Sequence, residues 1–149
     1  MALASEKELW AAYLTDIESR PLTGGHLLGA YEDALFAALE RMADGWERRF
    51  LASRSLTDRT PALTAHSLRH CSEVSASVVR IVADRLPGQS PGHTELRLLL
   101  GLMLAAWHRA LETWTSSDAV RQDRAALIRH TREAFAVIPS VAALAAQES

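Results

Sequence analysis

The segment Leu96–Trp107 carries more apolar surface than one side of a helix can bury. At about 100° per residue, its large apolar side chains spread over about two-thirds of the helix circumference. A helix at the surface of a globular domain needs a single apolar stripe, and this segment is far wider than that. The side chains concerned are Leu96, Leu98, Leu99, Leu100, Leu102, Met103, Leu104 and Trp107.

This width predicts a partner for the helix. Each large apolar side chain left in water forfeits about 1.5–3 kcal/mol, so several exposed leucines would exceed the stability of a typical domain. The core of one chain covers one side of the helix, and a second copy would cover the other by two-fold pairing. The alternative is that the amino-terminal helix covers the extra face within the same chain.

The rest of the sequence reads as helix throughout, which predicts an all-α fold of about five helices in an antiparallel bundle. Period-two alternation and Asn-Gly or Asp-Gly turns are absent, so strands are not expected. Ser5 and Glu8 have the spacing of a capping box, and Thr60-Pro61 has the pattern of a helix start. The expected helices cover residues 6–19, 26–52, 61–86, 92–115 and 119–138, the last one stopped by Pro139 and followed by an alanine-rich tail.

The last two of these helices are the predicted dimer interface. The helix over 119–138 has a narrow apolar stripe with alanines beside it, which suits close contact between helices. Two copies would then form a four-helix seam. The residues assigned to it are Leu98, Leu102 and Arg109 on one helix and Leu127, Thr131 and Phe135 on the other.

Length, charge and cysteine content narrow the class of protein. The chain has 149 residues, which suits a single domain over 1–149, and a formal charge of −2, which disfavours nucleic-acid binding by bulk electrostatics. Its one cysteine, Cys71, fits a reducing compartment. The start of the chain lacks the apolar run of a signal peptide, and the longest apolar run is about half a membrane span. We therefore expect a cytoplasmic protein that does not interact with membranes.

Catalytic and metal-binding motifs are weak. His66, His70 and Glu73 can share one flank of a helix at a spacing that could hold a transition metal. Nucleophile elbows, phosphate-binding loops, dinucleotide fingerprints and Cys-x-x-Cys pairs are absent from the sequence. We expect no enzyme activity, no cofactor and no metal, with a helical metal-binding protein using the two histidines and Glu73 as a lesser alternative.

Several segments together resemble the carboxy-terminal regulatory domain of TetR-type transcriptional regulators. The stretch from Thr60-Pro61-Ala62-Leu63 to Ala83-Asp84-Arg85-Leu86 is similar to that family, as are Arg109-Ala110-Leu111-Glu112-Thr113-Trp114 and the closing Glu133-Ala134-Phe135. Ser5-Glu6-Lys7-Glu8-Leu9 resembles the helix that follows the family's DNA-binding head. The helix-turn-helix head would precede residue 5, so this chain would reach DNA only through a head that it does not contain.

The resemblance implies a homodimer that binds a small-molecule effector between helices and acts as a repressor. A mainly apolar or aromatic effector with one polar or anionic handle would suit the candidate walls. Arg49 could meet the anionic group, or it could reach solvent from the edge of the apolar stripe of its helix. The small polar residues of the helix over 61–86 would instead allow close packing, which favours the alternative of a ligand-free dimerisation module. The candidate walls are Met42, Trp46, Arg49, Ser67, Cys71, Ser75, Met103 and Trp107.

Overall fold

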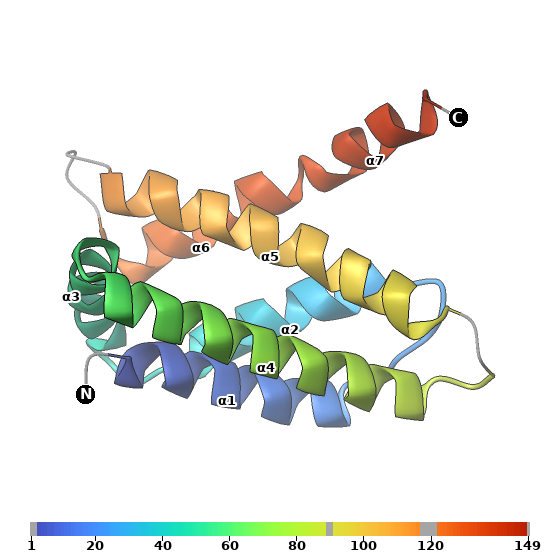
Figure 1. The fold of residues 1–149 in the computed structure, drawn as a ribbon, viewed down its shortest axis with the longest axis horizontal. Helices are drawn as coiled ribbons and strands as arrows, with labels where there is room; N and C mark the ends of the chain where they lie inside the picture. Colours follow the sequence, from blue (N-terminus) through green and yellow to red (C-terminus); the bar gives the residue numbers. More distant parts are fainter. Residues whose placement is uncertain (1–2, 89–90, 117–121, 149) are drawn as a thin grey trace. The chain divides into compact units, whose positions relative to one another are not determined.

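The computed structural model describes residues 3–88, 91–116 and 122–148, and these residues form helices and no strands. The all-α prediction is confirmed, with seven helices in the described residues where five were expected (Figure 1). No helix among these residues is both long enough and apolar enough to cross a membrane. The helices are α1 (Ala4–Ser19), α2 (Leu27–Arg41), α3 (Trp46–Arg59), α4 (Pro61–Arg85), α5 (His93–Ser116), α6 (Arg124–Phe135) and α7 (Ile138–Ala146).

The chain divides into two compact units, Met1–Leu100 and Gly101–Ser149, and the division falls within the continuous helix α5. In the first unit α1 contacts α2, α3 and α4, and α3 also contacts α4. One stripe of α1 supplies much of the core of this unit, because residues at helical spacing on it are almost fully buried. They are Leu9, Trp10, Tyr13 and Ile17.

The predicted helix over 26–52 is wrong, because the chain breaks it at Gly45. Helix α2 ends at Arg41, and Gly45 takes a left-handed backbone with φ of 86° just before α3 begins. Residues with a side chain rarely adopt this conformation, whereas glycine does so at little cost. Because α3 is a separate helix, the faces of its side chains no longer follow from the register of α2. Trp46 and Phe50 lie in the core.

Two further helix boundaries differ from the predictions. Helix α1 begins at Ala4 with Leu3 as its cap, so Ser5 and Glu8 do not form the expected capping box. Helix α6 begins at Arg124, where the Asp123 side chain accepts a hydrogen bond from the backbone N–H of Ala126. The expected start at residue 119 lies outside the described residues.

From the sequence we expect Pro139 to stop a helix. Instead, Pro139 lies in the first turn of α7. Proline is tolerated there because the first turn has no internal partner for a backbone N–H. The alanine-rich tail is thus a helix of nine residues. In the second unit, the side chains that are almost fully buried include those of Met103, Trp107, Leu111, Trp114, Leu127, Thr131 and Phe135.

Two buried tyrosines link three helices of the first unit. The Tyr13 hydroxyl donates to the Tyr31 carbonyl oxygen at 2.9 Å, and the Tyr31 hydroxyl donates to the Leu96 carbonyl oxygen at 3.2 Å. Burial raises the pKa of Tyr31 from 10.0 to about 12. Burial, with a smaller contribution from the charges of Tyr31 and Asp16, also holds the pKa of Tyr13 well above its usual value. Ionising either phenol would leave a buried charge in an apolar core.

We expect the free energy of unfolding to fall as the pH rises from about 10 towards 12. An unfolded tyrosine ionises near pH 10, whereas the buried ones hold their protons to higher pH, so the folded state binds more protons across this window. The contribution of the two protonated tyrosines to the free energy of unfolding is therefore fully present below pH 10 and is lost progressively above it. Urea titrations at several pH values measure the loss, and Tyr31→Phe should make it shallower. Tyrosinate absorbance of the folded protein rising fully near pH 10 would contradict the prediction.

Candidate functional site

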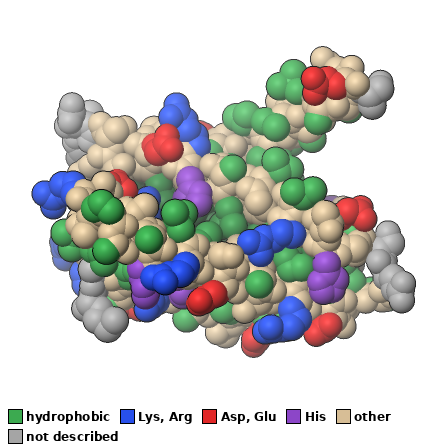
Figure 2. Space-filling view, viewed as in Figure 1, with side chains coloured by type: hydrophobic (Ala, Val, Ile, Leu, Met, Phe, Trp, Pro, Cys, Tyr) green, Lys and Arg blue, Asp and Glu red, His purple; other side chains and the backbone are tan. Residues whose placement is uncertain are grey.

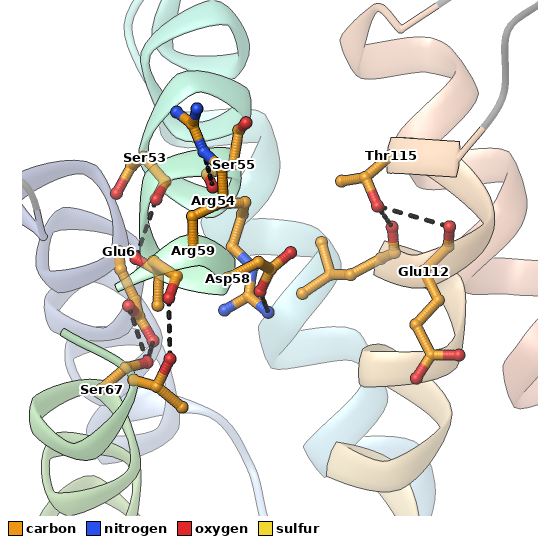
Figure 3. A network of polar contacts seen from close by, with 12 residues as sticks. Glu6, Ser53, Arg54, Ser55, Asp58, Arg59, Ser67, Glu112 and Thr115 are labelled. Atoms are coloured by element: carbon orange, nitrogen blue, oxygen red, sulfur yellow. Dashed lines mark hydrogen bonds and ion pairs between the residues drawn. The ribbon is translucent and has the colours of Figure 1, made fainter. Parts of the chain in front are cut away.

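A buried carboxylate lies where α1 meets α4 in the first unit. Glu6, in the first turn of α1, is 7% exposed, and the Ser67 hydroxyl of α4 lies 2.8 and 3.1 Å from its two carboxylate oxygens (Figure 3). Within the described residues, no ion pair involves Glu6. The positive end of the α1 dipole favours a negative charge at this position. A hydroxyl has one hydrogen to donate, so the carboxylate retains capacity to accept further hydrogen bonds.

Hydroxyl groups continue from this point along α3 and α4. The Thr64 hydroxyl donates to the Thr57 carbonyl oxygen at 2.7 Å, and the Thr57 hydroxyl donates to the Ser53 carbonyl oxygen at 2.8 Å. Ser53 and Thr57 are buried. These bonds satisfy the hydroxyls where α3 and α4 pack together, as buried polar groups require. Hydroxyl and carboxylate groups thus accompany the packing of α3 and α4 and of α1 and α4.

The α4 residues assigned to the polar wall differ in burial, and their role in binding stays a prediction. Ser67 and Ser75 are buried, and the Ser75 hydroxyl donates to the Cys71 carbonyl oxygen at 2.8 Å. Cys71 is half-buried. Burial is the largest effect and raises the pKa of its thiol; the hydrogen bond with Ser75 lowers it by less, and the charges of Glu6 and Arg97 have still smaller, opposite effects. The thiol therefore remains protonated near neutral pH, which does not suit a nucleophile.

An aromatic pair lies beside this wall, on the helix that contacts both α1 and α4. The rings of Trp46 and Phe50 stack at 4.6 Å between centroids with 14° between their planes. The Trp46 indole N–H donates to the Ser5 carbonyl oxygen at 2.9 Å, which joins α3 to the residue before Glu6. From the sequence we assign Trp46 to the pocket wall. Its backbone partner, Ser5, directly precedes the buried Glu6 in the chain.

Arg49 does not point towards this interior. Its guanidinium lies 3.0 Å from the Glu8 carboxylate, and both side chains are largely exposed. A single helix over 26–52 places Arg49 within the inner arc, from whose edge it can also reach solvent, and contact with a ligand stays a prediction. Met42 caps the end of α2 and is half-buried. Met103 and Trp107 are buried residues of the second unit, and their role in a pocket stays a prediction.

The metal-binding alternative finds no support. Among the residues that the structure describes, no three His, Cys, Asp or Glu side chains lie close enough to hold a metal ion. His66 and Glu73 are exposed, whereas His70 is half-buried. The buried Nε2 atom of His70 has no hydrogen-bond partner in the described part of the chain.

The predicted interface residues separate into two groups. Leu98 is 67% exposed, Leu102 is half-buried, and Arg109 is exposed with its guanidinium 3.3 Å from Glu112. By contrast, the three residues assigned to the last helix are buried in the single chain, so their burial does not require a second copy. These residues are Leu127, Thr131 and Phe135.

The structure also shows an open groove that the sequence did not indicate. It lies between α4 and the beginning of α5, within the first unit, and has a volume of about 390 Å³. Finding it requires the register of two helices, which sequence periodicity does not give. Its lining residues are Ala76, Val79, His93, Thr94, Arg97 and Leu98.

Comparison with known protein families decides the class of this chain. A family model of TetR carboxy-terminal domains, described as the MftR C-terminal domain, matches residues 26–141, more than half of the chain. The chain belongs to this family. No curated protein and no solved structure matches it. As a TetR C-terminal domain, the chain has helices α2 to α6 inside the matched region, while α1 and the end of α7 lie outside it.

Proposed function

We propose that the chain is the effector-binding and dimerisation domain of a TetR-type transcriptional regulator. The observation that carries this proposal is the family match over residues 26–141. In an intact regulator, the effector would favour one of two helix arrangements, and the paired domains would transmit this to two DNA-binding heads. The chain itself would act in the cytoplasm as a homodimer and would contact DNA only through such a head.

The effector site that we propose lies within the first unit, between α1, α3 and α4. Trp46 supplies an aromatic surface, while Ser67 and Cys71 supply the polar wall, with Glu6 behind them. Ligand sites commonly combine an apolar lining with a few polar groups of this kind. A mainly apolar or aromatic molecule suits these walls.

The polar handle of this effector should donate hydrogen bonds. An anionic handle was expected to meet Arg49, but Arg49 is paired with Glu8 at the surface. The buried group is the Glu6 carboxylate instead, which accepts hydrogen bonds and would repel an anion. We therefore propose an amine or another donor as the handle.

Replacing Glu6 with glutamine should weaken the binding of apolar amines roughly 10- to 100-fold, because a hydrogen bond to a charged group contributes about 1.5–3 kcal/mol. Thermal-shift measurements with arylalkyl amines and arylalkyl carboxylates of the same length would show stabilisation by the amines alone. Calorimetry would then give the affinities of the wild type and the Glu6→Gln variant.

The matched control is Glu8→Gln, which makes the same chemical change on the same helix at an exposed position. It should leave amine binding unchanged. Equal stabilisation by the carboxylates, or equal amine affinity in Glu6→Gln, would contradict the proposed handle. Failure of every apolar or aromatic compound to stabilise the protein would contradict the effector site as a whole.

A further inference from the structure

Helix α7 presents an unpartnered apolar face in the single chain. Val137 is 55% exposed, Val141 is 44% exposed and Leu144 is 63% exposed. Their spacing of four and then three residues places them on one side of the helix. Figure 2 shows hydrophobic side chains gathered on the exposed surface of this helix. A helix of nine residues is too short to be stable in water without packing against something.

The groove between α4 and α5 is a surface onto which such a helix can fit. Ala76 and Val79 line it from α4, and Thr94 and Leu98 line it from α5, so four of its lining side chains are small or apolar. Small side chains let a docked helix approach closely. Leu98, at 67% exposed, offers a large apolar contact at the edge.

We propose that the α7 face of a second copy of this chain docks into the α4–α5 groove. Three anchors at positions i, i+4 and i+7 are the pattern by which an amphipathic helix binds a groove between two other helices. Two-fold symmetry then makes each copy both donor and acceptor of a helix, which closes the assembly at a dimer.

Charge favours this occupant. The groove carries the positive charge of Arg97, which is exposed. The end of α7 brings Glu148, together with the partial negative charge of a helix carboxy-terminus. Electrostatic complementarity of this kind sets the direction in which a helix lies in its groove.

The docked helix adds to the dimer contacts of the proposed function. The family model ends at residue 141, whereas Leu144 and Glu148 lie beyond it. The contact is therefore a feature of this chain in addition to pairing through α5. It can fail while the proposed dimerisation holds, and the experiment below separates the two outcomes.

Disulfide crosslinking of the full chain tests the contact directly. Cys71 is the only cysteine, so Cys71→Ser gives a background without thiols. Leu144→Cys and Ala76→Cys are then combined in one chain and oxidised, because a disulfide forms only when the two Cα atoms come within about 4.4–6.8 Å. The expected product on a non-reducing gel is a covalent dimer from the double variant, and monomers from each single variant.

Three results would overturn the proposal. A dimer from Leu144→Cys alone would mean that two α7 helices pair with each other. A crosslinked monomer from the double variant would mean that α7 folds back onto its own chain. An uncrosslinked double variant that light scattering shows to be dimeric would leave the proposed dimerisation intact but exclude α7 from the groove, whereas a monomer in light scattering would count against both.

The affinity of the dimer provides a second measurement. Leu144→Asp removes one apolar anchor from each of the two docked helices, and a combined loss of at least about 3 kcal/mol raises the dimer Kd more than about 100-fold. Ala143→Asp is the matched control, because it adds the same charge to α7 about 130° away from the three anchors. Equal Kd values for the two variants in sedimentation equilibrium would overturn the proposal.

Discussion

Replacing Trp46 with alanine is expected to lower the free energy of unfolding by about 3–5 kcal/mol, the range for removing a large aromatic side chain from a core. Trp46 is fully buried and stacks on Phe50. The substitution also leaves the Ser5 carbonyl oxygen without the indole N–H that donates to it. A loss of this size is a large part of the stability of a typical domain. Urea unfolding followed by circular dichroism measures it.

Trp46→Phe is the control that separates the loss of the buried ring from the loss of the indole hydrogen bond. It keeps an aromatic ring in the core and removes the indole N–H, so its cost should be distinctly smaller and should come mainly from the lost indole hydrogen bond and a small cavity. An alanine variant that unfolds within about 1 kcal/mol of the wild type would show that Trp46 is not in the core.

The sequence predicts helix starts well where proline marks them, and less well where glycine breaks a pattern. Thr60-Pro61 begins α4 as expected, because proline fits the first turn of a helix. Gly45 was passed over, since a single glycine also occurs inside helices. In the structure α2 ends at Arg41 with an extended Met42, and the left-handed Gly45 precedes the start of α3.

The same break explains why Arg49 is directed towards the surface. A wheel drawn through one continuous helix gives Arg49 a place on the inner stripe, whereas α3 begins with a new direction and turns Arg49 towards Glu8. The apolar residues were less sensitive to this, because burial favours Trp46 wherever the helix directs it towards the interior. Burial does not favour a charged side chain such as that of Arg49 in the same way.

For Glu6, the sequence could indicate its place on an apolar face but not its hydrogen-bond partner. It lies three residues before Leu9, on the stripe that continues through Tyr13, so the sequence shows a carboxylate on an apolar face. Its partner, Ser67, is 61 residues away, and the periodicity of one helix contains no information about that contact. Pairing between distant helices is set by the fold.

The last prediction separates residues of the core from residues of an interface. Leu127→Ala should lower the free energy of unfolding by about 2–5 kcal/mol, because Leu127 is 0% exposed in the single chain and the change leaves a cavity. Leu98→Ala makes the same chemical change at a side chain that is 67% exposed. It should leave the unfolding of the subunit within about 0.5 kcal/mol of wild type and should raise the dimer Kd.

Urea unfolding and sedimentation equilibrium, each over a range of protein concentrations, distinguish the two effects. Loss of a core side chain lowers the stability of the subunit and leaves the association constant of the folded protein unchanged, whereas loss of an interface side chain changes association. If Leu127→Ala raised the dimer Kd while the subunit kept its stability, Leu127 would belong to the interface, as its helical stripe first suggested. The division of apolar side chains between core and interface would then have to be redrawn, because Leu127 and Leu98 would face a partner together.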